Sequence, residues 1–354
     1  MASSLGSVVT AAATAILSSA SVISLGAVSY RWSLLSESST KDLSKLQSTL
    51  LEPLLAFSAL CSLTGAELMA STPLLLWPLL HATLAICITY PLLPRSPRRG
   101  ALLTCATFGN AGALPTALIP VLLSGPAISQ AMLFVQVYLA TWRLLLWSVV
   151  PALISSSTIK KNDDATGSAL QESWRSWLFR LLLPPPSIGS LLGIALAFAP
   201  NKLRTLLISG PLSFCYSAAK MAGAASPPLV LINLGFALCG VGSTQKAAMT
   251  AGASSAAFTS REITIVCTVK MLVLPAIHLV LAPILHPTSQ APLSDPFHLV
   301  LLLQAAMPAA VSVQAIFQRE GADTKPLGTM MLVQYALAMP TIVATIVFAS
   351  MMHA

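Results

Sequence analysis

Apolar residues along this chain do not alternate with polar ones but run together in long stretches, each bounded by charges, prolines or glycines. A helix needs about 20 apolar residues to cross a bilayer. The pattern therefore predicts an all-α polytopic membrane protein with ten membrane-spanning helices. The expected spans are 5–29, 46–65, 72–93, 101–123, 129–153, 178–199, 226–245, 262–285, 297–318 and 327–350.

Composition agrees with this pattern and excludes several classes of protein. Hydrophobic residues make up 55% of the 354 residues and charged residues only 8%, against about a quarter charged in a soluble domain. Neither a nucleotide-binding glycine loop ending in Lys-Ser/Thr nor a His-Glu-x-x-His metal motif occurs. The six cysteines have no metal-ligand spacing. We therefore expect neither an enzyme nor an ATP-driven pump, with no catalytic residue, metal or cofactor.

Basic residues gather in alternate loops and predict the orientation. Loops that follow the odd-numbered spans hold most of the lysines and arginines, whereas those after the even-numbered spans hold only Lys202, Arg204 and Lys220. The positive-inside rule places the basic loops in the cytosol and both termini outside or in a lumen. The net charge of +8 is then explained by topology and by contact with anionic lipid, without a nucleic-acid partner.

One long polar stretch, residues 155–176, divides the spans five and five. It predicts a first repeat over 1–154, a short cytosolic loop over 155–177 and a second repeat over 178–354. An odd number of spans inverts the second repeat relative to the first, as in many secondary transporters. A weak internal likeness supports the repeat, because MLFVQVYLA at 132–140 resembles MMLVQYALA at 330–338.

Two spans are interrupted by proline at matching places in the two halves. They read GNAGALP at 109–115 and QAAMP at 304–308. In a continuous helix Pro115 would free the carbonyl of Ala111, and Pro308 that of Gln304. Freed backbone is tolerated in hydrocarbon only where it is buried in protein or lines a cavity. Paired interruptions of this kind point to a transporter's substrate site, although a proline kink with glycines for helix packing is the alternative.

The side chains around these breaks form the predicted site. Asn110 offers an amide for a carboxylate, whereas Arg143 and Lys270 could balance an anion's charge; Arg143 could instead snorkel, and Lys270 could pair with Glu52. His81 and His278 could relay protons or bond to neighbouring helices. Because no carboxylate is expected at the crossover, an anionic or neutral solute is favoured. The predicted substrate-binding residues are Gly109, Asn110, Ala111, Gly112, Pro115, Gln136, Tyr138, Gln304, Pro308 and Gln334.

At these residues the chain resembles the auxin efflux carrier superfamily, in particular its PIN-LIKES branch. The likeness rests on GNAGALP at 109–115, DPF at 295–297, LLLQ at 301–304, AMPA at 306–309 and PPSIGSLL at 185–192. It implies an inverted repeat like that of sodium/proton antiporters or bile-acid transporters, with spans 1, 2, 6 and 7 as scaffold and spans 3–5 and 8–10 as a moving transport domain. It also implies the endoplasmic reticulum membrane and transport of auxin or similar weak organic acids.

The sequence thus predicts a secondary transporter that moves a small organic anion by an elevator-type mechanism. It is expected in an intracellular membrane, that of the endoplasmic reticulum, with both termini in the lumen. The sequence leaves open a location in the plasma membrane and the formation of a homo-oligomer. Two alternatives also stay open. One is an ion-coupled carrier of bile-acid-like solutes, and the other is a membrane sensor or scaffold that transports nothing.

Overall fold

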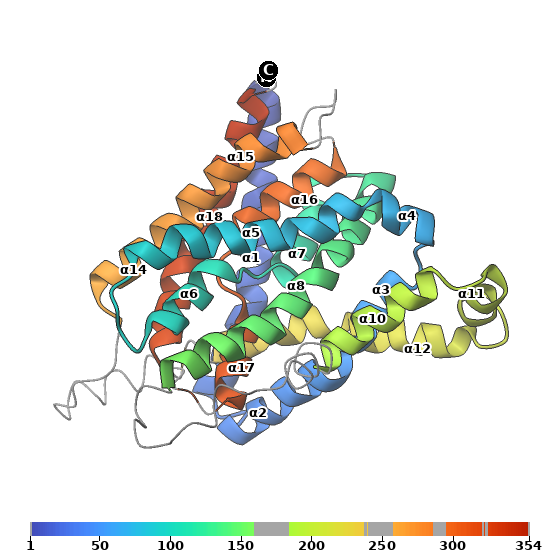
Figure 1. Ribbon diagram of the computed structural model, residues 1–354, viewed down its shortest axis with the longest axis horizontal. Coiled ribbons are helices and arrows are strands. Elements are labelled where there is room, and N and C mark those ends of the chain that lie inside the picture. The colour runs from blue at the N-terminus through green and yellow to red at the C-terminus, as the bar shows by residue number, and fades with distance from the viewer. Residues whose placement is uncertain are drawn as a thin grey trace, which may run out of the picture.

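The computed structural model describes residues 2–158, 184–236, 239, 258–285, 295–320, 322 and 325–352. Within these ranges the chain is helical and forms no strand, apart from an isolated antiparallel bridge between Gly109 and Ala309. Long helices run across the molecule in layers (Figure 1). The prediction of an all-α protein is confirmed for the described residues.

Four helices in the described ranges are long and apolar enough to cross a membrane, over Thr72–Leu92, Pro126–Ile154, Ser260–Ile284 and Pro326–Ala349. They agree with the expected spans 3, 5, 8 and 10. The first and second are α5 (Thr72–Leu92) and α8 (Pro126–Thr158); the third is one helix made of α14 (Ser260–Thr268), the π-helical turn η3 (Val269–Val273) and α15 (Leu274–Leu285); the fourth is α18 (Lys325–Met352).

The two proline-containing spans are each broken into half-helices. The first consists of α6 (Arg99–Thr107) and α7 (Ala113–Leu122), and the second of α16 (Pro296–Ala305) and α17 (Val311–Arg319). Contrary to the prediction, Pro115 does not interrupt a continuous helix. It lies in the first turn of α7, where its missing N–H had no helical partner to lose. Pro308 lies within the break itself.

A second group of helices packs around α3 (Glu52–Leu60), and small residues permit close approach. A methyl group at Gly193 of α10 (Pro185–Ala197) would lie 2.8 Å from Leu60 Cβ. Gly223 of α12 (Ser213–Ala224) approaches the α3 backbone at Leu55 in the same way. Gly26 and Gly235 likewise bring α1 (Ala2–Arg31) against the helical residues 226–236. These crossings leave no room for a larger side chain.

The remaining described helices are short. The predicted loop between spans 6 and 7 contains two of the short helices, α11 (Asn201–Ile208) and α12. The predicted loop 155–177 lies outside the described residues from 159 onward, and its first residues continue α8. The other short elements are α2 (Glu37–Leu46), η1 (Gln47–Leu51) and α4 (Gly65–Ala70).

Candidate functional site

The two breaks cross each other and pair through their backbones. Asn110 N donates to Pro308 O at 2.6 Å, and Ala310 N donates to Phe108 O at 2.9 Å. These bonds flank the bridge between residues 109 and 309. Each interrupted segment thus supplies hydrogen-bond partners that the other lost when its helix ended.

Two glutamines satisfy further backbone groups at the crossover. Gln304 Nε2 donates to Ala111 O at 2.9 Å, which is the carbonyl that the sequence marked as freed. Gln334 Oε1 accepts from Ala309 N at 2.7 Å, and its Nε2 donates to Cys105 O at 3.3 Å. Gln334 has no exposed surface. Both side chains therefore lock the crossover in place.

Asn110 joins the crossover to two neighbouring helices. Its Oδ1 accepts from Ala113 N at 3.2 Å and so caps the first turn of α7. Its Nδ2 donates to the hydroxyl of Tyr335 on α18 at 2.8 Å. One hydrogen of the Asn110 amide remains for a ligand, since the group carries two.

A cavity of about 70 Å³ lies against the crossover. Its walls come from the crossover and α8 on one side and from α3 and residues 226–236 on the other. The space holds a few water molecules, each of which occupies about 30 Å³ in the liquid. The lining residues are Glu52, Leu55, Gly109, Asn110, Ala111, Gly112, Ala113, Thr116, Gln136, Leu139, Trp142, Arg143, Leu146, Ser226, Pro227, Val230, Ala310, Val311 and Ser312.

Polar atoms in this wall lack partners among the described residues. Nη1 of Arg143 and Oε1 of Gln136 are buried and make no hydrogen bond. Glu52 also lines the cavity, and its Oε1 accepts from Gln47 Nε2 at 2.9 Å. Buried polar groups are nearly always bonded. The free donor of Arg143 and the free acceptor of Gln136 therefore mark a place where a polar ligand or water would bind.

Comparison with known proteins decides the family. The profile of the membrane transport protein family matches residues 11–346, which is nearly the whole chain. The chain belongs to the membrane transport protein family. It is an integral membrane transporter of the auxin efflux carrier type, and members of this family are transporters and not enzymes. A search of curated proteins found no match.

The predicted site residues of the transporter fall into two groups. The first group lines the cavity and consists of Gly109, Asn110, Ala111, Gly112, Gln136 and Arg143. The second group does not line it and consists of Pro115, Tyr138, Gln304, Pro308, Gln334 and Lys270. Gln304, Pro308 and Gln334 build the crossover, as described above. The roles of the first group in binding stay predictions.

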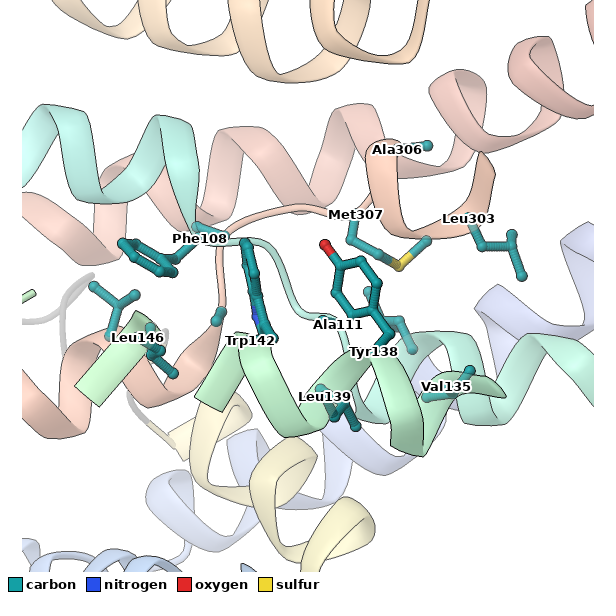
Figure 2. Close-up of a cluster of buried hydrophobic side chains, with 14 of the residues drawn as sticks. Phe108, Ala111, Val135, Tyr138, Leu139, Trp142, Leu146, Leu303, Ala306 and Met307 are labelled. Carbon is teal, nitrogen blue, oxygen red and sulfur yellow. The ribbon is translucent and has the colours of Figure 1, made fainter. Parts of the chain in front are cut away.

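Tyr138 was expected beside the substrate, but it lies in the apolar core of the transporter. Its ring is 5.6 Å from that of Trp142, and its exposed fraction is 1%. Figure 2 shows Tyr138 and Trp142 of α8 standing against Phe108 and Met307 of the two breaks. Tyr138 thus packs against the crossover within the apolar core and does not line the cavity.

The sequence left open a pairing of Lys270 with Glu52, and the structure does not show this pairing. Its Nζ donates to Thr107 O at 3.0 Å and lies 3.4 Å from His81 Nε2. Glu52 lies instead in the cavity wall. The expectation that no carboxylate lies near the crossover is therefore wrong for Glu52. The sequence of a span does not say which of its faces lies against the crossover.

Sequence reasoning did not single out Glu52, Thr116 or Ser226, which line the cavity, as site residues. Glu52 carried a usable signal, since an ionisable residue inside a span is functional by default. Thr116 and Ser226 carried none, because single hydroxyl residues are common in membrane helices, where they bond to their own backbone. Thr116 Oγ1, for example, donates to Gly112 O at 2.9 Å.

A second cavity of about 570 Å³ opens one helical turn further along α8. Trp147 lines it, whereas Arg143 and Leu146 line the first cavity. Lys41, Lys45 and Arg319 also line it, so its described wall is strongly basic. An anion would be drawn into such a space.

Proposed function

We propose that this transporter moves auxin or a similar small organic anion across an intracellular membrane by elevator-type alternating access. The observation that carries the proposal is Arg143, whose exposed fraction is 6% and whose Nη1 has no partner within the described residues. A buried guanidinium donor without a partner is costly and is suited to a carboxylate. The solute's carboxylate would bind Arg143 and the free hydrogen of Asn110.

The rest of the wall fits the body of an aromatic or aliphatic acid. Beyond its few polar atoms the wall is apolar, with Leu139, Trp142 and Val230 among the lining residues. A pocket of mostly apolar side chains with a few placed polar groups is typical of small-molecule sites. Glu52 sits in the same wall and is held by Gln47, so it would also repel a second negative charge. This wall favours a monoanion with an apolar ring.

The position of the cavity supports an elevator movement. It is too small for an indole acid as it stands, so its two walls must separate to admit one. Close glycine crossings tie α3 to α10 and α12, and α1 to residues 226–236. The crossover is held together separately, by the hydrogen bonds of Gln304 and Gln334 to its backbone. Movement is then easiest between these two bodies, which correspond to the scaffold and the transport domain that the resemblance implies.

The basic cavity would serve as the cytosolic vestibule of this route. Its cations come from α2 and α17, which adjoin loops that the positive-inside rule assigns to the cytosol. We place the protein in the endoplasmic reticulum membrane with both termini in the lumen. A solute would pass from Arg319 and Lys45 along α8 to Arg143.

Uptake of radiolabelled indole-3-acetate into proteoliposomes tests this function. Wild type should give saturable uptake above empty vesicles. Both Asn110→Ala and Arg143→Gln should lose most of it while remaining folded by size-exclusion chromatography. Lys220→Met, at an exposed position of α12, is the matched control and should transport normally. Folded wild type that carries neither this acid nor other organic acids would overturn the proposal, and wild-type kinetics in Arg143→Gln would remove the site.

A further inference from the structure

Next to the crossover, three basic side chains form a buried chain. Lys270 comes from η3, His81 from α5 and His278 from α15. The exposed fractions of these side chains are 0%, 1% and 0%. A π-helical turn in the middle of a membrane helix often marks a functional position, and here it carries Lys270.

The hydrogen bonds of this chain are consistent with one arrangement of hydrogens on the two rings. His278 Nδ1 lies 2.8 Å from Leu274 O, which can only accept, so this nitrogen carries a hydrogen. In a neutral ring His278 Nε2 then accepts from His81 Nδ1, at 3.2 Å. His81 Nε2 is left as an acceptor and faces Lys270 Nζ at 3.4 Å. In this tautomer the hydrogen bonds are donated from Lys270 to His81 and from His81 to His278.

Thr107 O serves as a common acceptor for either cation. It lies 3.0 Å from Lys270 Nζ and 3.2 Å from His81 Nε2. Because α6 ends at Thr107, this carbonyl has no partner within the helix and sits at the negative end of the helix dipole. A proton on Lys270 is stabilised there. If it moved to His81 Nε2, the new N–H would point at the same oxygen.

No carboxylate neutralises this group within the part of the chain that the structure describes, since the ion pairs found there do not include Lys270. Burying an unpaired charge is costly, whereas Thr107 O favours it, and this balance leaves both protonation states accessible. Other titratable or charged side chains on the surrounding elements include Cys105 on α6, Glu262 and Cys267 on α14, Arg143 and Tyr138 on α8, His298 on α16, and Tyr335 on α18, whose hydroxyl is bonded to Asn110.

Gly109 connects this group to the cavity. It lines the cavity, and a methyl group at its position would lie 3.1 Å from Lys270 Nζ. Only a glycine backbone therefore separates the lysine from a bound solute. A positive charge on Lys270 Nζ would attract an anion bound at Asn110, because opposite charges several ångströms apart attract strongly where water is excluded.

We propose that Lys270, His81 and His278 form a proton-binding site that couples the binding of an organic anion in the crossover cavity to the uptake of a proton. This inference rests on the proposed function. Uptake of a proton converts the neutral Lys270 amine to an ammonium, which donates to Thr107 O and to His81 Nε2. Both imidazoles stay neutral in this step. Release of the anion reverses this step, and coupling is reciprocal.

Binding of radiolabelled indole-3-acetate to purified protein between about pH 6 and pH 9, where a carboxylic acid stays ionised, tests the coupling. Wild type should bind at least about tenfold more tightly at the lower pH, and a pH-sensitive dye should report proton uptake on binding. Lys270→Met should bind weakly at every pH, and Lys270→Arg, always charged, tightly at every pH. Lys220→Met should behave as wild type. Pronounced pH dependence that persists in Lys270→Met would overturn the proposal.

A second measurement does not depend on any solute. The difference in melting temperature between wild type and Lys270→Met should change across the same pH range, because only wild type can bind the proton there. A difference that is constant with pH would overturn the proton site, whatever the protein carries. Wild type that binds no indole-3-acetate but shows this pH-dependent difference would instead count against the proposed solute and support the proton site.

Discussion

Arg143→Gln tests the predicted anion site most directly. A hydrogen bond to a charged partner contributes about 1.5–3 kcal/mol, and about 1.4 kcal/mol corresponds to a tenfold change in affinity. If Nη1 of Arg143 binds the solute's carboxylate, the substitution should raise KM for indole-3-acetate uptake about 10- to 150-fold. Gln136→Leu, which removes only a neutral partner from the same wall, should raise KM about fivefold.

Glu52 complicates this substitution, because it lines the same cavity. Removing the guanidinium would leave the half-buried carboxylate of Glu52 without an opposite charge nearby, which is itself costly. The double variant Arg143→Gln with Glu52→Gln separates the two effects. A solute-binding role predicts that the double variant transports as weakly as Arg143→Gln alone. Recovery of wild-type KM in the double variant would refute our reasoning and reduce Arg143 to a counter-charge for Glu52.

Three further predictions concern the crossover, the helix crossings and the vestibule. Gln334→Leu strands two buried backbone groups and should lower the free energy of unfolding by about 2–6 kcal/mol in denaturant melts. Gly193→Ala, whose new methyl would press on Leu60 Cβ at 2.8 Å, should cost about 1–3 kcal/mol, whereas Gly112→Ala meets only an ordinary contact and should melt as wild type. Arg319→Gln should raise KM and weaken the dependence of uptake on salt, because one charge fewer attracts the anion; an unchanged salt dependence would contradict the vestibule.

The sequence was sufficient to predict the paired breaks but not their detailed position. Prolines at 115 and 308 indicated where two helices fail, and the structure has both failures. The break near Pro115 lies just before the proline, since proline is favourable in the first turn of a helix. The glycines at 109 and 112 fall inside the break, where a ligand or another segment approaches the backbone. Pro115 therefore follows the end of the first break, whereas Pro308 lies inside the second.

Long-range pairings were beyond the reach of the sequence. Lys270 and His81 are 189 positions apart, and nothing in either span says that they meet. The same holds for Gln304 and Gln334: their polarity in apolar spans was visible, but a free amide and an amide bonded to backbone look alike in sequence. Which face of a span meets the crossover depends on the packing of all the helices, and this decides whether a polar residue binds solute or holds the fold.

The crossover itself is poorly suited to change its internal structure during transport, and this restricts where the conformational change can occur. Its backbone is paired across the breaks, and Gln304 and Gln334 bond Ala111 O and Ala309 N. Opening it would break several buried hydrogen bonds at once, each costly to leave unmade. The opposite wall, made of α3 and residues 226–236, meets it across a cavity lined largely by apolar side chains, and such contacts can slide without losing specific bonds. A rigid crossover also keeps Lys270 at a constant distance from Gly109, so that its charge acts on the bound anion equally on both sides of the membrane.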